Sequence, residues 1–129
     1  PTLIMAIAQR LVRTLCPGSG KKIPIEGSMK QMIENQFADL PQEYRKEIEI
    51  FDSIYEIDPS PSCPTGTQGR VAVYEMMEMN KEIEDIILKN PIESEIYKIA
   101  RQKGMLTMKE DAILKSFKGQ VPFEEVNEL

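Results

Sequence analysis

Two short motifs pair a cysteine with a serine three positions away. Cys16-Pro17-Gly18-Ser19 and Ser60-Pro61-Ser62-Cys63 each look like a Cys-x-x-Cys pair with one sulfur replaced by a hydroxyl. A structural zinc site needs about four ligands, so two thiolates, with Asp58 as an oxygen donor, would hold metal only weakly. The pattern favours two free thiols near one another over a degenerate metal site at Cys16 and Cys63. A disulfide is the third alternative.

The segment Gly18-Ser19-Gly20-Lys21-Lys22 is similar to the end of a phosphate-binding loop. Leu15 stands where the first glycine should be, and Lys22 replaces the Ser or Thr that would bind Mg²⁺. The segment also follows a predicted helix, whereas the motif requires a strand before it. We therefore interpret these residues as a surface loop.

Other side chains with reactive groups do not form a catalytic constellation. The chain has no histidine, which excludes His-based triads and imidazole general bases. Acidic residues stand at predicted helix starts, where negative charge is favourable, so we interpret them as helix caps: Glu110, Asp111, Glu124 and Glu125. The methionines are interpreted as core residues: Met76, Met77, Met79, Met105 and Met108. We predict no catalytic residue and no cofactor-binding residue.

Length and composition limit the class of protein. The chain has 129 residues, 41% of them apolar and 29% charged, which fits one globular domain. The net charge of -5, without a run of positive residues, argues against a nucleic-acid partner. Two cysteines are too few for a disulfide framework and suit a reducing compartment. No apolar stretch is long enough for a transmembrane segment.

The spacing of apolar residues predicts the elements. Apolar residues at steps of three and four predict an amphipathic helix over residues 3–15, and a weaker helix follows over 28–40. Residues 54–57 and 70–75 are rich in β-branched and aromatic side chains and predict a β-ribbon. Further helices are expected after Asn80, after Asn90-Pro91, from the capping box Thr107-Met108-Lys109-Glu110, and after Pro122.

These elements predict an α+β fold that is mostly helical. It would have one N-terminal amphipathic helix, a variable helical insertion, a small antiparallel β-ribbon and a C-terminal bundle of three to four short helices. Pro1 in place of an initiator methionine suggests a piece of a longer protein.

Three blocks together resemble the C-terminal region of the type II secretion and type IV pilus assembly ATPases, which are hexameric secretion motors. The blocks have the same order and spacing as in that family, and the resemblance covers the chain apart from residues 18–51. They are Ala8-Gln9-Arg10-Leu11-Val12-Arg13-Thr14-Leu15-Cys16-Pro17, Gly69-Arg70-Val71-Ala72-Val73-Tyr74-Glu75, and Ala100-Arg101-Gln102-Lys103-Gly104-Met105-Leu106-Thr107-Met108-Lys109-Glu110-Asp111.

The resemblance implies a division of the chain into three parts. Residues 1–17 would be a helix that continues from an absent ATPase core. Residues 18–76 would hold a degenerate zinc loop with an insertion and the β-ribbon, and residues 77–129 a helical subdomain. The family's zinc loop has four cysteines, of which Cys16 and Cys63 survive, with Ser19 and Ser60 at the lost positions. Zinc is therefore not the expected ligand.

The resemblance also suggests which residues form interfaces. Arg10 and Arg13 are expected to lie close to the ATPase core. Arg70 is expected to bridge the ribbon to a carboxylate of the helical subdomain, and Tyr74 to bury its ring. The full set of interface or structural candidates is Gln9, Arg10, Arg13, Gly69, Arg70, Tyr74, Glu75 and Arg101.

The implied function is that of a non-catalytic part of an ATPase. This chain lacks the phosphate-binding loop, the acidic Walker B strand and the histidine motif, so ATP and Mg²⁺ would bind elsewhere in the parent protein. The expected partners are the ATPase core, neighbouring subunits of a hexamer and an inner-membrane platform protein, in ATP-driven assembly of pilins or pseudopilins. The expected location is cytoplasmic, peripheral at the inner membrane. The alternative is a free-standing helical adaptor that mediates protein-protein interaction.

Overall fold

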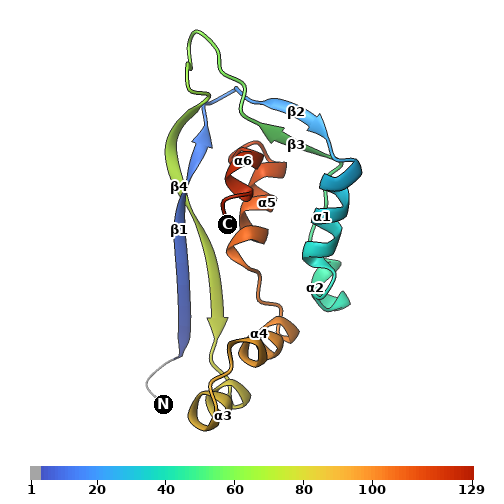
Figure 1. The fold of residues 1–129 in the computed structure, drawn as a ribbon, viewed down its shortest axis with the longest axis vertical. Helices are drawn as coiled ribbons and strands as arrows, with labels where there is room; N and C mark the ends of the chain where they lie inside the picture. The colour runs from blue at the N-terminus through green and yellow to red at the C-terminus, as the bar shows by residue number, and fades with distance from the viewer. Residues whose placement is uncertain (1–3) are drawn as a thin grey trace.

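The computed structural model describes residues 4–129, and in this range two strands, two helices, two further strands and four helices follow one another along the chain (Figure 1). The longest helix among residues 4–129 has 11 residues, so none of these helices could span a lipid bilayer. The elements are β1 (Met5–Leu15), β2 (Lys21–Pro24), α1 (Gly27–Phe37), α2 (Gln42–Arg45), β3 (Ser53–Glu56), β4 (Thr67–Glu78), α3 (Lys81–Lys89), α4 (Glu93–Gln102), α5 (Met108–Phe117) and α6 (Phe123–Val126).

The strands form two separate two-stranded antiparallel sheets. β1 pairs with β4, from Met5 opposite Glu78 to Leu15 opposite Thr67. The shorter β2 pairs with β3 in the second sheet. The loops that follow β1 and β3 connect the two sheets. The predicted ribbon therefore has the right strands but the wrong partners, because each strand pairs with an N-terminal segment and not with the other.

The predicted N-terminal helix is wrong. Most of that segment is the strand β1, and its predicted start at Leu3 lies outside the described residues. Apolar side chains lie on both faces of β1. Their positions in the sequence therefore also fit the three- and four-residue steps of a helix. Pairing with a strand more than 50 residues further along the chain decides the outcome. The fold is α+β but not mostly helical, since only 38% of it is helix.

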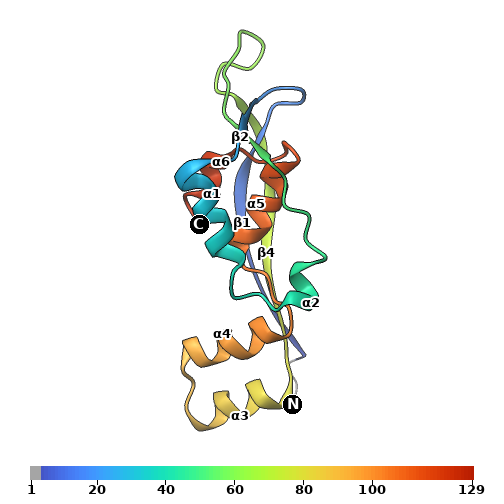
Figure 2. The same ribbon diagram turned by 90° about the vertical axis from the view of Figure 1, so that its right-hand side faces the viewer.

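Helix α5 lies at the centre of the molecule. It packs against β4 and β1 on one side and approaches α1 and β3 on the other (Figure 1), and in the view turned by 90° it overlaps the two strands (Figure 2). Its side chains Ala112, Ile113 and Phe117 are buried, and Phe117 stacks on Phe51 with ring centroids 5.4 Å apart. The core around it is formed by Val12, Ile33, Phe37, Leu40, Ile54, Val73, Val121 and Val126.

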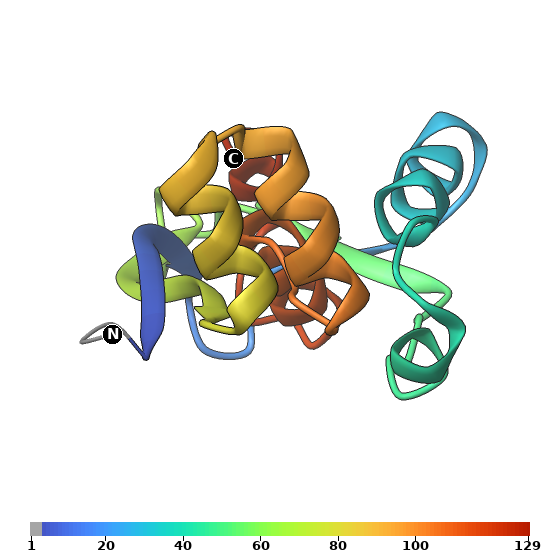
Figure 3. The ribbon, with the colours of Figure 1, turned by 90° about the horizontal axis from the view of Figure 1, so that it is seen from below.

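The C-terminal helices agree with their predicted signals. The Asn80 side chain accepts a hydrogen bond from the Ile83 backbone N–H at 2.9 Å, which caps α3. The capping box of α5 is also present, with Thr107 and Glu110 bonded reciprocally. Helices α3 and α4 lie side by side at the end of the molecule away from the loops (Figure 3). The division into residues 1–17, 18–76 and 77–129 remains a prediction, without its initial helix.

Candidate functional site

Arg101 is the most completely bonded charged side chain of the described region. It is 2% exposed, although it belongs to the last turn of α4. Its Nη1 donates to Glu110 Oε1 at 2.5 Å and to the Met105 carbonyl at 2.8 Å, and its Nη2 donates to Glu110 Oε2 at 2.9 Å and to the Gln36 carbonyl at 3.1 Å. Nε donates to Asp39 Oδ1 at 3.0 Å. All five N–H donors of the guanidinium can therefore be satisfied without water.

Glu110 completes this pair from the first turn of α5. Its carboxylate is fully buried and also accepts from the Thr107 backbone N–H at 3.0 Å and from Gln36 Nε2 at 2.7 Å. Burial lowers the pKa of Arg101, but the hydrogen bond and the charge of Glu110 outweigh it and hold that pKa above its usual value. Arg101 therefore stays charged inside the protein.

Asp39 extends the network to the surface. It follows α1, and its Oδ2 accepts from the Tyr97 hydroxyl at 2.9 Å. Burial and this hydrogen bond raise the pKa of Tyr97 to about 12. Residues from α1, α4 and α5 thus meet at one guanidinium, and we call Gln36, Asp39, Tyr97, Arg101 and Glu110 the Arg101 network.

A second ion pair joins β1 to α6. Arg13 donates to Glu125 three times, from its backbone N to Oε2 at 2.8 Å and from Nε and Nη2 to Oε1 at 2.9 and 2.8 Å. Arg10 reaches the same end of the chain and donates from Nη1 to the Glu128 carbonyl at 3.0 Å. Both arginines predicted to lie at an ATPase core therefore contact the C-terminal residues of this chain.

The Glu125 carboxyl has a pKa below its ordinary value. Burial raises this pKa, but hydrogen bonds from the Arg13 backbone and side chain, together with the charges of Arg13 and Arg10, lower it further than burial raises it. Glu125 is 8% exposed, whereas half of the Arg13 side chain is exposed. The carboxylate is therefore the more deeply buried partner.

The other predicted residues of the β1–β4 ribbon make fewer hydrogen bonds and ion pairs than Arg13 does. The Arg70 side chain is exposed, and no carboxylate of residues 4–129 pairs with it. Its cross-strand neighbour Arg13 makes the predicted bridge instead. Gly69, beside Arg70, has a φ of +77°, which favours glycine. Gln9 is exposed and Glu75 is half-buried.

One face of the β1–β4 ribbon carries apolar side chains that the described residues leave exposed. We call it the outer face. Helix α5 packs against both strands, and Tyr74 and Met76 also border a cavity of about 350 Å³ together with Met105 and Leu106. Its members alternate along both strands and include the Tyr74 ring, which was predicted to be buried. They are Met5, Ile7, Leu11, Tyr74 and Met76, exposed by 38%, 59%, 55%, 41% and 52%.

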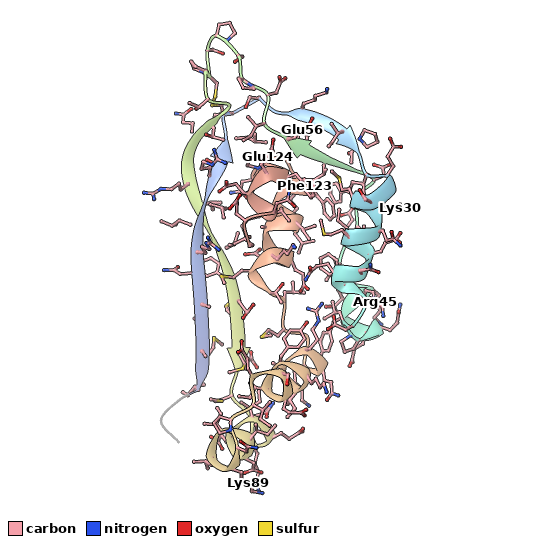
Figure 4. The ribbon with its side chains drawn as sticks, in the orientation of Figure 1. Lys30, Arg45, Glu56, Lys89, Phe123 and Glu124 are labelled. Carbon is pink, nitrogen blue, oxygen red and sulfur yellow. A yellow bond between two sulfur atoms is a disulfide. The ribbon has the colours of Figure 1, made fainter. Side chains whose placement is uncertain are left out.

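At the edges of the same ribbon, carboxylates accept hydrogen bonds from some of the outward backbone N–H groups. The outward backbone N–H of Tyr74 donates to Asp111 Oδ2 at 2.9 Å, and that of Arg13 donates to Glu125. Figure 4 labels Glu124 on α6, whose carboxylate accepts from the Ile57 backbone N–H at 3.1 Å, just after β3 of the other sheet. The acidic side chains of α5 and α6 therefore fix the ribbon to the helices.

The two cysteines are joined in a disulfide. The Cα atoms of Cys16 and Cys63 lie 6.5 Å apart, within the range of this bond. Ser19, Ser60 and Asp58 line the same cavity of about 390 Å³. No group of three or more metal-binding Cys, Asp or Glu side chains occurs among residues 4–129. These donors do not fit a structural zinc site, and the third alternative for the cysteines is the one found.

Sequence reasoning missed the acidic halves of both ion pairs. Glu110 and Glu125 were interpreted only as helix caps, and Asp39 was not singled out. Capping does explain part of the position of Glu110, since it bonds the Thr107 backbone. The missing signal was long-range, because the partners of Arg13 and Arg101 depend on how the helices pack.

Known proteins with a similar sequence belong to bacterial secretion and pilus systems. Residues 1–128 match the family described as type II/IV secretion system protein. The type IV pilus assembly ATPase PilB of Acinetobacter baylyi is 33% identical over 125 residues, which is 95% of this chain and 20% of the relative. The type II secretion system protein E of Xanthomonas campestris pv. campestris is 32% identical over 120 residues, or 93% and 20%. The chain thus spans about one fifth of the length of these relatives.

Replacing Arg101 with Met should destabilise the protein strongly. Removal of one partner leaves Glu110 buried without its counter-charge, which costs about 3–5 kcal/mol of unfolding free energy. Urea denaturation measures the change. The control is Lys98→Met, because the Lys98–Glu95 pair is exposed and 3.6 Å long, so its loss should cost about 0.5 kcal/mol or less. Equal effects of the two substitutions would contradict the role given to Arg101.

The Arg13–Glu125 pair should stabilise the protein in a pH-dependent way. Because the folded pKa of Glu125 lies below the unfolded one, the wild type should exceed Glu125→Gln in stability above about pH 4.3. This advantage should disappear as the pH falls through the lower folded pKa. Thermal unfolding of both proteins from pH 7 to pH 3 tests it. Arg13→Gln should reduce this advantage, since only the backbone N–H bond to Glu125 remains, and Arg70→Gln should retain it; an advantage that does not shrink as the pH falls from about 4.3 to about 3 would refute the assignment.

Restoring the two missing thiols should restore metal binding. Ser19→Cys combined with Ser60→Cys places four cysteines around one cavity, and we expect about one zinc per chain. Zinc is measured by plasma mass spectrometry after purification under reducing conditions. The control, Ser19→Cys with Ser62→Cys, changes the Cys-x-x-Cys spacing in the same cavity and should bind less. Stoichiometric zinc in the wild type would show that the serines are not the reason for weak binding.

Proposed function

The chain belongs to the family of type II/IV secretion system proteins, and from this membership we propose that it is the C-terminal part of an ATPase that drives pilin or pseudopilin assembly. The family match over nearly the whole chain supports the motor class. The relatives named as a pilus assembly ATPase and as a secretion protein support the two candidate systems. ATP and Mg²⁺ would bind outside these residues, because no complete phosphate-binding motif occurs in this sequence.

The observation that carries the proposal is the outer face of the ribbon. A two-stranded ribbon is marginal alone, and here the apolar side chains of its outer face remain 38% to 59% exposed. Contiguous exposed apolar side chains indicate a surface for another protein segment. The matched relatives are about five times longer than this chain. A polypeptide of that length has further residues that could cover the outer face. We assign that cover to the ATPase core of the same polypeptide.

The Arg101 network gives this surface a rigid support. It fixes α4 and α1 to α5, and α5 in turn packs against β4. Movement of the ATPase core would then be transmitted to the helices α3 and α4 at the end of the ribbon. Those helices would contact neighbouring subunits of a hexamer or a platform protein of the inner membrane. The contact would lie on the cytoplasmic side of that membrane.

Polar substitution of the outer face should uncouple the chain from the core. Ile7→Thr with Leu11→Thr removes two exposed apolar side chains but keeps strand-forming residues, so the fold of residues 4–129 should persist. In the full-length protein we expect ATPase activity and the hexamer fraction to fall roughly tenfold, as for loss of an interface anchor. Phosphate release and light scattering measure the two quantities.

The matched control is Ile50→Thr, since Ile50 is 48% exposed but lies outside the ribbon. It should leave both quantities unchanged. Full activity of the ribbon variant would refute the assignment of the outer face to the core. A full-length polypeptide that hydrolyses no ATP would support the alternative, a free-standing adaptor.

A further inference from the structure

The disulfide lies where the two sheets meet. The β1–β4 ladder ends at Leu15 opposite Thr67, and the β2–β3 ladder begins with Lys21 opposite Glu56. Between these pairs the chain runs through two loops, residues 16–20 and residues 57–66. Cys16 is in the first loop and Cys63 in the second, so the bond joins the loops across the junction.

Each loop is held together by its own hydrogen bonds. In the first, the Cys16 carbonyl accepts from the Ser19 backbone at 2.9 Å and from Ser19 Oγ at 2.7 Å. In the second, Ser60 and Cys63 exchange two backbone hydrogen bonds of 3.0 Å. Within residues 4–129 no hydrogen bond runs from one loop to the other. The disulfide is therefore the direct tie between two turns that are each already folded.

The second loop depends on this tie for its position. Figure 1 shows residues 57–66 projecting beyond both sheets, where only Cys63 and Gly66 are buried. Exposed, proline-containing loops with few buried contacts open at low free-energy cost. Breaking the bond would release the loop and leave the α5 core unchanged, because the core residues lie elsewhere.

Both cysteines border a cavity through which a small molecule can approach. Cys16 and Cys63 are 9% and 6% exposed, and the cavity that they line has a volume of about 390 Å³. Its wall is open on the side of Gly18, where an added Cβ would meet no atom within 4 Å. Thiol–disulfide exchange requires this access to one sulfur.

We propose that Cys16 and Cys63 form a reversible redox latch that exchanges with a low-molecular-weight thiol such as glutathione. The thiolate of one glutathione attacks one sulfur, the protein S–S bond breaks, and the released cysteine thiolate takes a proton. A second glutathione thiolate attacks the mixed disulfide. The products are two protein thiols and one glutathione disulfide, so two electrons pass from glutathione to the protein. The oxidised form fixes residues 57–66 against residues 16–20, and the reduced form releases them.

The test equilibrates the full-length protein in buffers with varied ratios of reduced to oxidised glutathione and quenches it with acid. Trypsin should give residues 14–21 linked to residues 47–70 in the oxidised form, which mass spectrometry detects. The linked pair should disappear within the range of ratios tested and return on reoxidation. Cleavage within residues 57–66 by proteinase K should be on the order of tenfold faster in the reduced form.

The control variants are Cys63→Ser and Cys16→Ser, which keep a polar side chain of similar size. Each should be cleaved at the rate of the reduced wild type and should have a melting temperature independent of glutathione, whereas that of the wild type should rise on oxidation. Two titratable thiols at every ratio, bound zinc that blocks both thiols, or a cleavage rate unaffected by reduction would each overturn the proposal. The result is independent of ATPase activity, so it does not depend on the proposed function.

Discussion

The buried pair of Arg101 and Glu110 is the interaction on which the arrangement of the helices depends. A charged pair with almost no exposure is tolerated only when every remaining donor and acceptor finds a partner. Gln36, Asp39 and the Met105 carbonyl supply those partners, and they come from α1, the turn after α1 and the loop before α5. One guanidinium thereby determines how segments more than 60 residues apart in the sequence meet.

The remaining parts of the structure follow from the position of α5. One side of this helix covers the inner face of the β1–β4 ribbon, and carboxylates of α5 and α6 bond the ribbon at its edges. The outer face is left as an exposed apolar surface on a rigid support. The two loops at the far end of the ribbon meet at the disulfide, where the sequence predicted a degenerate zinc loop.

Local signals were sufficient for the helices and insufficient for the sheets. The caps at Asn80 and Thr107 and the stop at Gly119 locate α3 and α5, because each acts within one turn of the chain. The segment of β1 carries apolar residues at both two- and four-residue steps, so only its distant partner β4 decides between strand and helix. The sequence was enough to select arginines as candidates, but their acidic partners depend on how the helices pack. The bridge predicted for Arg70, for example, is made by its neighbour Arg13.

The central claim is that the outer face of the ribbon is covered in the full-length protein. Methionine oxidation by dilute hydrogen peroxide tests it most directly, because Met5 and Met76 are 38% and 52% exposed when only residues 4–129 are present. Peptide mass spectrometry compares their oxidation rates in the native and urea-unfolded full-length protein. The account predicts that Met76 is oxidised at least about tenfold more slowly in the native protein. Oxidation of native Met76 at nearly the unfolded rate would contradict it.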